Sequence, residues 1–193
     1  QRLRAIDGVT GISWSNWFGG IYITERNFFP QFAVDGPSYL PLYPEFVLDD
    51  AQRLAWLRDR QGVVVGRKLA GKFGWKVGDT IPLRGTIFPG TWTFNLRAIY
   101  DGVDASVDEN QMLMHWSYLN ETLRARNRGR GSDFVGVYVI GIRDPANAAL
   151  ISQRVDAQFR NSRAETLTET EKAFQLGFVA MSEAILVALQ AVS

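Results

Sequence analysis

The sequence contains no cysteine and only one histidine, His115. The lack of cysteine excludes disulfides and thiolate metal ligands. A single histidine makes a multi-histidine zinc site or a Ser-His-Asp triad difficult to assemble, and no GxSxG motif accompanies it. His115 lies between Met114 and Trp116 and is expected to be a partly buried packing residue. No acid and base pair can be named, so the chain is not expected to be an enzyme.

The sequence also lacks an excess of charge of either sign. It contains 21 Lys and Arg residues and 20 Asp and Glu residues, for a net charge of +1. A near-neutral domain is not expected to bind nucleic acid or an anionic membrane surface over its whole face. Arg124, Arg126, Arg128 and Arg130 alternate along a Gly-containing segment, which we expect to be a flexible, solvated hairpin tip. The alternative is an RNA-binding loop with strongly salt-dependent affinity.

The length of 193 residues and the 46% hydrophobic content fit one globular domain or two small lobes. The chain begins at Gln1 without an initiator Met or a signal-peptide pattern, and it stops inside an apolar segment. We therefore expect it to be a piece of a longer protein.

The stretch Gly62–Gly85, GVVVGRKLAGKFGWKVGDTIPLRG, is predicted to form one compact structural unit. Its run of valines, residues 63–65, favours a buried strand. A short helix is expected after Gly66, and Gly74 can end it in the left-handed conformation. Residues 80–83 alternate again and predict a second strand.

The same stretch comes close to the phosphate-binding motif GxxxxGK[ST]. Phe73 stands where a hydroxyl must reach the metal, and residues 67–70 are helix formers where a phosphate-cradling loop is needed. The sequence therefore predicts no nucleotide site, and no cofactor or metal site is predicted elsewhere in the chain.

Hydrophobic periodicity and capping residues predict the remaining elements. Strands are expected at residues 10–17, 21–23, 28–34, 91–100, 112–115, 134–142 and 164–167, and helices at residues 2–6, 49–59, 117–126 and 144–159. Alternation in the strand at 91–100 predicts Trp92, Phe94, Leu96 and Ala98 on one face, and Ala51, Leu54 and Ala55 of the helix at 49–59 are expected to face inward or cover the edge. Residues 134–142, FVGVYVIGI, are nearly all apolar, which predicts a central strand covered on both faces. Acidic residues between Asp101 and Glu109 lack the spacing of a calcium loop and are expected to be solvated.

Two groups of residues are candidates for contacts. Trp14, Trp17, Phe18 and Tyr22 occur in a Gly-rich segment and are either core residues of a bent strand pair or an aromatic patch for sugar or lipid. The patch would suit a stand-alone extracytoplasmic glycan- or lipid-binding module.

The last predicted helix begins with a capping box formed by Thr168 and Glu171. Phe174 and Phe178 start an apolar stripe at heptad-like spacing, and beyond Glu183 the helix becomes apolar on every side. We expect a stalk that enters a membrane, with a coiled-coil or dimer helix as the alternative.

Five segments together resemble one family. In chain order they are GVTGISWSNWFGGIY, NFFPQFAVD, VVVGRKLAGKFGWKVGDTIPLRG, FNLRAIYDG and ETLTETEKAF. They are similar to the extracytoplasmic domain of MacB-like permeases, the FtsX-type membrane subunits of ATP-binding cassette (ABC) transporters. The resemblance covers nearly the whole chain, and its motifs are structural.

The resemblance implies an α+β fold with two lobes. A discontinuous porter-like lobe would contain residues 1–24 and 132–170, an inserted β-rich lobe would contain residues 25–131, and a stalk or transmembrane helix would start in residues 171–193. The stalk residues Thr168, Glu171, Phe174 and Phe178 would couple this helix to the domain.

The resemblance also implies a function in the inner (plasma) membrane, with this domain on the periplasmic side. ATP would bind to a separate cytoplasmic ABC ATPase, and the domain would transmit its motion to efflux or to the handling of a lipoprotein or peptide outside. Partners would be that ATPase, a second permease copy, and a periplasmic adaptor or substrate protein.

Overall fold

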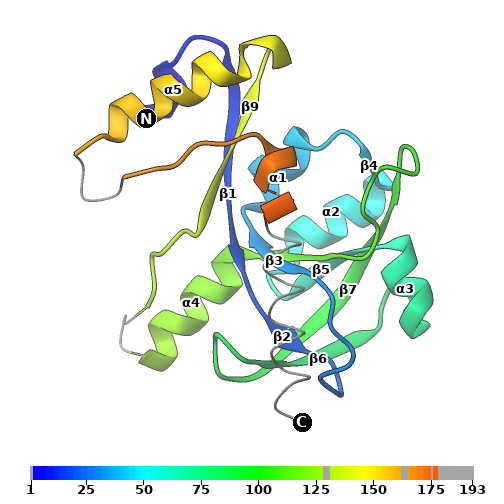
Figure 1. The fold of residues 1–193 in the computed structure, drawn as a ribbon. Coiled ribbons are helices and arrows are strands. Elements are labelled where there is room, and N and C mark those ends of the chain that lie inside the picture. Colours follow the sequence, from blue (N-terminus) through cyan, green and yellow to red (C-terminus); the bar gives the residue numbers. More distant parts are fainter. Residues whose placement is uncertain (1, 128–130, 162–164, 175, 178–193) are drawn as a thin grey trace. The chain divides into compact units, whose positions relative to one another are not determined.

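The structure is a computed structural model, and it describes residues 2–127, 131–161, 165–174 and 176–177 (Figure 1). The chain forms two compact units, one with residues 1–11 and 141–193 and the other with residues 12–140. The lobe bounds implied by the family resemblance differ from these bounds, and the assignment of family lobes stays a prediction.

A mixed sheet carries most of the second unit. The bounds of its strands are β1 Val9–Trp17, β2 Gly20–Ile21, β3 Gln31–Val34, β4 Phe46–Val47, β5 Gly62–Gly66, β6 Thr80–Gly85, β7 Gly90–Gly102, β8 Met112–His115 and β9 Val137–Ile142. The strand order is β2-β6-β7-β5-β8-β3-β1-β9, and β4 pairs with β7. The pairs β5/β7 and β3/β8 are parallel, whereas β5/β8, β6/β7 and β1/β3 are antiparallel.

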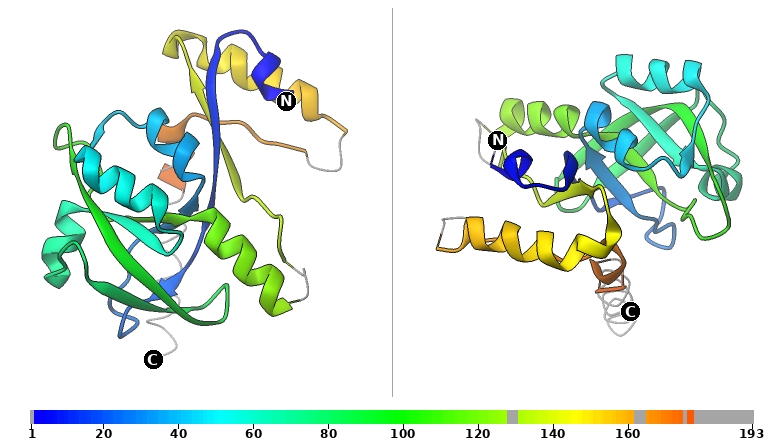
Figure 2. Two further views of the ribbon diagram at one scale, coloured as in Figure 1. Left: turned by 180° about the vertical axis from the view of Figure 1, so that it is seen from behind. Right: turned by 90° about the horizontal axis from the view of Figure 1, so that it is seen from above.

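Helices accompany this sheet, which confirms the predicted α+β class. Their bounds are α1 Gly36–Tyr39, η2 Leu40–Leu42, α2 Asp50–Arg58, α3 Arg67–Phe73 and α4 Trp116–Asn127 in the second unit, and η1 Leu3–Ala5, η3 Pro145–Asn147 and α5 Ala148–Phe159 in the first. Figure 2 shows α2 along the sheet, where it contacts β5 and β7. Asp49 caps α2 by accepting a hydrogen bond from Gln52 N at 3.0 Å, as its sequence predicts.

Strand β5 is buried along its whole length between β7 and β8. This confirms the strand predicted from the valine run. Helix α3 follows at once, and Gly74 ends it with a φ of 69°, the left-handed conformation that glycine adopts without a steric penalty.

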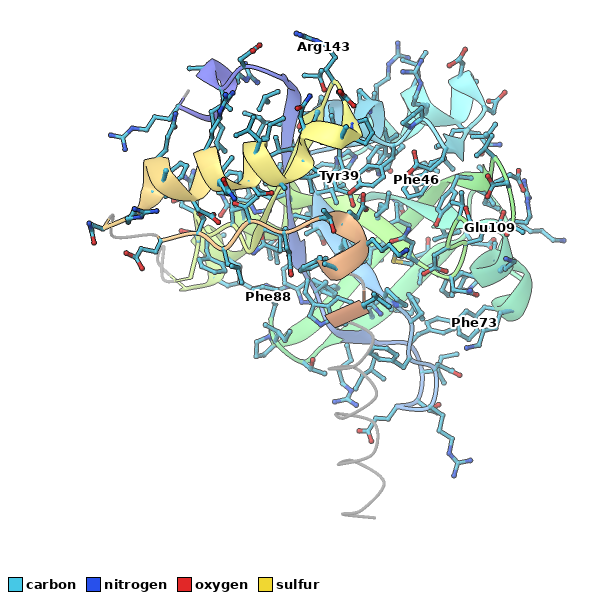
Figure 3. All side chains as sticks on the ribbon, turned by 45° about the horizontal axis from the view of Figure 1, so that its top comes forward. Tyr39, Phe46, Phe73, Phe88, Glu109 and Arg143 are labelled. Atoms are coloured by element: carbon cyan, nitrogen blue, oxygen red, sulfur yellow. The ribbon has the colours of Figure 1, made fainter. Side chains whose placement is uncertain are left out.

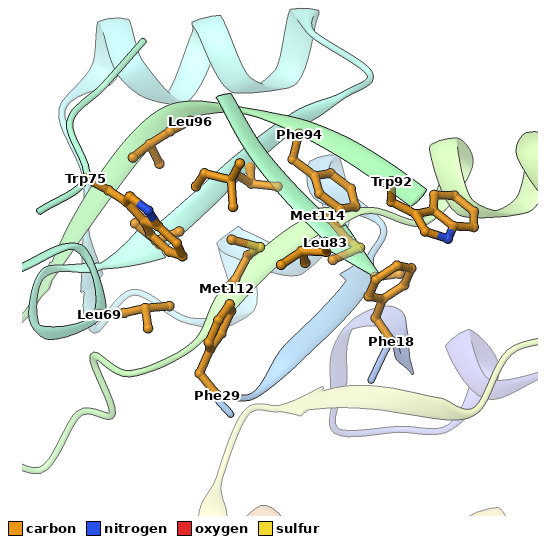
Figure 4. Close-up of a cluster of buried hydrophobic side chains, with 14 of the residues drawn as sticks. Phe18, Phe29, Leu69, Trp75, Leu83, Trp92, Phe94, Leu96, Met112 and Met114 are labelled. Carbon is orange, nitrogen blue, oxygen red and sulfur yellow. The ribbon is translucent and has the colours of Figure 1, made fainter. Parts of the chain in front are cut away.

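Two hydrophobic cores flank the sheet. The α2 core contains Trp56 of α2 with Val64, Ala98 and Leu113 of the strands, and Tyr39 and Phe46 pack into it (Figure 3). The α3–α4 core is larger and contains residues from α3, α4 and the same central strands (Figure 4), among them Phe18, Phe29, Leu69, Trp75, Leu83, Trp92, Phe94, Leu96, Met112 and Met114.

An irregularity in β7 divides its side chains between the two cores. Leu96 is aligned with Val63 in β5, but Ala98 is aligned with Val64, so the register shifts by one residue between these pairs. Leu96 accordingly belongs to the α3–α4 core and Ala98 to the α2 core. The expectation that strict alternation keeps both residues on one face is wrong, because a bulge changes the face.

Strand β9 corrects a second expectation. Residues 134–142 were expected to form a central strand, yet β9 is the last strand in the sheet order. Its Tyr138 is 54% exposed, and the other five residues of the strand are only partly buried. An apolar, β-branched run predicts a strand but does not determine which neighbours it acquires.

Two smaller expectations also change. In α2 the buried residue is Trp56, whereas Leu54, expected to face inward, is 46% exposed. The indole of Trp56 fills the α2 core and donates to Gly62 O at 3.1 Å, which sets the orientation of the helix. Residues 165–167, the described part of the strand predicted near the end of the chain, form no regular element.

The first unit contains the helix that the sequence predicts from a stripe of apolar residues. Asp144 accepts a hydrogen bond from Ala146 N at 2.9 Å and caps the turn before α5. Ile151 and Val155 are the buried residues of α5. Ile151 packs at Gly8, where the φ of 92° and the small space left by Ile151 both require glycine.

His115 is buried at the end of β8, as expected for a packing residue. Its ring stacks on Trp56 at a centroid distance of 4.5 Å, and Nε2–H donates to Trp56 O at 2.9 Å. Burial lowers the pKa of His115 below its ordinary value of 6.5, while the Trp56 carbonyl and the charges of Asp59 and Asp35 oppose this effect. At neutral pH the imidazole of the folded protein is therefore uncharged.

We expect the free energy of unfolding to fall as the pH drops from about 7.5 to about 5, because the unfolded chain takes up a proton that the folded chain resists. The slope for one such group reaches at most about 1.4 kcal/mol per pH unit. Urea unfolding across this range measures it. His115→Gln lowers stability at every pH but should lose this slope. An unchanged slope in His115→Gln would assign the effect to other groups.

Gly66 allows a close approach between the start of α3 and the loop before β8. A Cβ at Gly66 would lie less than 3.0 Å from three backbone atoms of Glu109, whereas a Cβ at Gly71 within α3 would meet nothing within 4 Å. Gly66→Ala should therefore destabilise the fold by at least about 1–3 kcal/mol through overpacking against backbone. Gly71→Ala should stabilise it by about 0.5–1 kcal/mol. Thermal unfolding measures both variants, and an equal change in stability for Gly66→Ala and Gly71→Ala would contradict the close approach of Gly66 to the Glu109 backbone.

Candidate functional site

The structure does not bring together the four aromatic residues predicted as a contact patch. Phe18 is fully buried in the α3–α4 core. Trp14 and Trp17 are three residues apart in β1 and so lie on opposite faces of the strand. Trp14 packs edge-on against Trp116 at 6.0 Å, and Tyr22 packs against Phe73 at 5.0 Å.

A smaller apolar surface lies around Trp17. Phe32 is the cross-strand partner of Trp17 in the β1/β3 pair, with ring centroids 5.4 Å apart, and the ring of Phe28 lies 6.0 Å away. Ile87 and Trp17 both approach Gly19, each 3.0 Å from the position of a Cβ there. Phe28 is 39% exposed and Ile87 is 54% exposed. These four residues, Trp17, Phe28, Phe32 and Ile87, are called the Trp17 surface below.

Sequence reasoning found only Trp17 among these residues. Phe28 and Phe32 are four residues apart within the strand predicted at 28–34, so their shared face could have been inferred from the period of two. Ile87 comes from the turn between β6 and β7 and has no local signal. Only the folded sheet brings it to Gly19.

The loop between β2 and β3, which follows Trp17 in the sequence, carries a strained and exposed side chain. Ile23 has a φ of 61° and is 75% exposed. Thr24 N donates to Tyr22 O at 2.6 Å, which closes a tight three-residue turn around Ile23. A β-branched residue in this conformation is a genuine outlier, and such strain is often kept where a side chain must be presented for contact.

Both ends of this loop are held firmly. Tyr22 accepts a hydrogen bond at its hydroxyl from Trp75 Nε1 at 3.1 Å, and its backbone oxygen accepts one from Asn27 Nδ2 at 3.1 Å. Phe29 is buried against Phe73 and Trp75. The exposed Ile23 is therefore carried on a braced turn and not on a free loop.

The region that resembles a phosphate-binding loop cannot cradle phosphate. Gly66 N donates to Gln111 O at 3.1 Å, and Leu69 N donates to Glu109 O at 3.0 Å. A bound phosphate would need these same N–H groups at the start of the helix, and they are already hydrogen-bonded within the fold. The Glu109 carboxylate lies 3.7 Å from Lys68 Nζ, so the local charge also disfavours an anion.

The acidic residues between Asp101 and Glu109 make specific hydrogen bonds within the fold. Arg67 donates to both oxygens of Asp101, at 2.9 and 2.8 Å, which lowers the pKa of Asp101 and raises that of Arg67. Asp104 binds the backbone and hydroxyl of Ser106, and Glu109 accepts from Gly102 N at 2.8 Å. Across the described residues, no cluster of three or more metal-ligating side chains forms.

The described arginines of the expected hairpin tip have structural partners. Arg124 and Arg126 lie in α4 and not in a loop. Arg124 pairs with Asp133 at 2.5 Å, and Arg126 lies over the Trp92 ring at 4.7 Å. Both guanidinium groups thus make contacts within the fold. Arg128 and Arg130 lie outside the described residues.

The segment that would lead to a stalk is attached to α5. The hydroxyls of Thr168 and Thr166 donate to the same oxygen of Asp156, at 2.7 and 3.2 Å. The capping box was predicted with Thr168 as the cap, but the helix begins at Glu171 and Thr170 is its cap, accepting from Ala173 N at 3.3 Å.

Among the remaining stalk residues, Phe174 N donates to Thr170 O at 3.0 Å, which places Glu171 and Phe174 in the first turn of a helix. Phe178 lies outside the described residues. None of the described helices combines the length and the hydropathy required to cross a membrane.

The strain at Ile23 can be tested by substitution. Ile23→Gly should raise the free energy of unfolding by about 0.5–1 kcal/mol, since removal of the left-handed penalty outweighs the entropy that glycine adds to the unfolded chain. Ile23→Ala keeps the penalty and should change stability by less than about 0.5 kcal/mol. Urea unfolding compares them. Equal stability of the two variants would show that the turn is not strained.

Comparison of the sequence with protein-family models and with curated proteins gave no match. Comparison of the structure gave clear similarities. The extracellular domain of the noncanonic ABC-type transporter YknZ from Gram-positive bacteria is 11% identical with a TM-score of 0.55, covering 85% of this chain and 83% of that domain. The periplasmic region of MacB from Actinobacillus actinomycetemcomitans is 11% identical with a TM-score of 0.55, covering 82% of this chain and 70% of that region.

These similarities extend over most of both chains, as the sequence resemblance implied. At 11% identity they establish the fold and leave the activity to be argued from the site. The chain has the fold of the extracytoplasmic domains of MacB-like ABC transporter permeases.

Proposed function

We propose that the chain is the extracytoplasmic domain of an ABC transporter permease and performs mechanical rather than catalytic work. The observation that carries the proposal is the shared fold with YknZ and MacB domains over more than four fifths of this chain. The membrane part of the protein would lie in the plasma membrane, and ATP would be bound and hydrolysed by a cytoplasmic partner.

The junction at Asp156 supplies a route for motion into the domain. Thr166 and Thr168 tie the segment before the helix at Glu171 to α5 through one carboxylate. A displacement of that helix would therefore pull on α5 and not be absorbed by a loose linker. The first unit, which contains these residues, also contains the first residues of β1.

Strand β1 supplies the route from there to the Trp17 surface. It begins at Val9 in the first unit and ends at Trp17 in the second. The strand pairs with β9 and, at Ser15, Asn16 and Trp17, with β3. An extended, paired strand resists stretching, so a displacement of its first residues would be passed along it. We propose that the Trp17 surface, with Ile23, engages an adaptor or substrate protein outside the membrane.

The chemistry of the surface favours protein contact. Aromatic and branched aliphatic side chains that are partly exposed are typical of protein interfaces, where they provide apolar area without charge. The described residues of the acidic loop are engaged in structural hydrogen bonds and pairs, which supports a non-catalytic role. A stand-alone glycan- or lipid-binding module stays the alternative function.

The full-length permease should co-purify with an ATPase from membranes. In that complex, with any cysteine outside residues 1–193 replaced by serine, a spin label on Ala51→Cys, an exposed site, should report an ATP-dependent change in the distance between two permease copies. Asp156→Ala removes the acceptor of Thr166 and Thr168. It should abolish the distance change while ATP hydrolysis stays within about twofold of the unaltered rate.

Asp144→Ala is the matched control, because it removes the cap before α5 in the same unit without touching the bonds of Asp156. It should keep the ATP-dependent distance change. A change that persists in Asp156→Ala would refute the proposed route. A permease purified without any ATPase would refute the transporter function and favour the binding-module alternative.

A further inference from the structure

The strands of residues 12–140 close on themselves. Pairing runs from β6 through β7, β5 and β8 to β3 and β1, and β2 pairs with β6 at the start of this path. Only Phe18 and Gly19 separate β1 from β2, so one continuous segment joins both ends of the path (Figure 1). The strands therefore form a closed barrel around the α3–α4 core.

The barrel has a seam between β2 and β3. Phe18 N donates to Gln31 O at 3.0 Å and continues the β1/β3 ladder. The same register would next place Gly20 opposite Phe29. The chain instead turns at Gly19, which has a φ of 65°, and in the described part of the chain β2 pairs with β6 alone. The backbone groups of Gly20 on the β3 side therefore need another partner.

The side chain of Gln31 is this partner. Its Oε1 accepts a hydrogen bond from Gly20 N at 2.5 Å, and its Nε2 donates to Gly20 O at 2.8 Å. One amide thus serves Gly20 as a peptide group of a neighbouring strand would. Gln31 is fully buried and Gly20 is buried, so breaking these bonds leaves two backbone groups unpaired away from water.

The seam passes through the Trp17 surface. Phe32 belongs to β3 and Phe28 precedes it, so both lie on the β3 side of the seam. Ile87 follows β6, the strand with which β2 pairs, and so lies on the other side. Closure of the seam is therefore required to hold the four residues of this surface together.

We propose that the Gln31 amide is a clasp, and that its release opens the seam between β2 and β3 locally and divides the Trp17 surface. The rest of the barrel stays folded, since the pairing from β6 to β3 does not pass through the clasp. The state of the clasp thus controls whether the surface is presented as a whole. The clasp is a property of the domain itself and does not depend on the proposed transport function.

Hydrogen exchange of the full-length protein in detergent, resolved to single residues by fragmentation mass spectrometry, tests the clasp without any substitution. A local opening exposes little surface, so exchange of the Gly20 amide should hardly change with low concentrations of urea. The amide of Val64 in β5 exchanges through global unfolding and should respond steeply. The same urea dependence for both amides would overturn the proposal.

Gln31→Met keeps a side chain of similar length but removes both hydrogen bonds. The protection factor of the Gly20 amide should fall about 10- to 100-fold. Thr86 N donates to Gly19 O at 3.3 Å on the β6 side of β2, and its protection factor should fall less than about threefold. An equal fall at Gly20 and Thr86 would indicate general destabilisation and refute a local clasp.

Asn120→Leu is the matched control. Asn120 is another buried amide with two hydrogen bonds, because it donates to Asp133 Oδ1 at 3.1 Å and accepts from Asp133 N at 2.6 Å. Its replacement should expose the Asp133 amide to exchange and leave the Gly20 amide protected. A loss of Gly20 protection as large as that in Gln31→Met would contradict the proposal.

Gln31→Glu separates hydrogen bonding from packing. A protonated carboxyl can donate and accept as the amide does, whereas a carboxylate can only accept. Burial raises the pKa of such a carboxyl above its ordinary value of about 4.3, so it is protonated at about pH 5 and ionised at about pH 9.5. Relative to the unaltered protein at the same pH, Gly20 protection should be within about twofold at pH 5 and about 10- to 100-fold lower at pH 9.5.

This ratio isolates the clasp from other titrations. Arg84 on β6, Glu25 in the β2–β3 loop and His115 on β8 are present in both proteins, so their effects cancel. A ratio that does not change with pH would show that the side chain at this position only fills space, and it would refute the clasp.

Discussion

The burial of β5 is the constraint on which the other elements of residues 12–140 depend. Each residue of this strand is buried, so its backbone groups must pair with β7 on one side and β8 on the other. Its valines alternate in direction, and each therefore requires its own hydrophobic core. Val63 and Val65 point into the α3–α4 core, and Val64 points into the α2 core. A sheet with helices and two cores follows from this one strand.

The bulge opposite β5 has a further structural consequence. With strict alternation, Tyr100 would belong to the same core as Phe94, and the α2 core would lose both Ala98 and Tyr100. The register shift at Arg97 instead sends Ala98 and Tyr100 to the α2 side. It also places Arg97 where its guanidinium reaches Asp59 at 2.8 Å, just after α2. The one extra residue in β7 thus directs two side chains into the α2 core and, through Arg97, holds the end of α2.

Local chemistry was sufficient to predict the features that depend on near neighbours. The caps at Asp49 and Asp144 and the left-handed Gly74 could be read from the sequence, because each is determined within a few residues. The place of β9 at the sheet edge could not be read, because an apolar strand suits either a central or an edge position. The cap of the helix that begins at Glu171 is Thr170 and not Thr168, whose hydroxyl donates to Asp156, a partner that no local pattern predicts.

The candidate surface was only partly predictable for the same reason. Trp17 was identifiable as an aromatic residue close to Gly19 and Gly20, but its neighbours come from β3, from the loop before β3 and from the β6–β7 turn. The sheet that brings them together is stiff, since backbone pairing continues from β1 through β7. A surface carried on such a sheet cannot change its own shape readily. The transmission of motion that we propose requires such a surface, because it would be displaced as a whole.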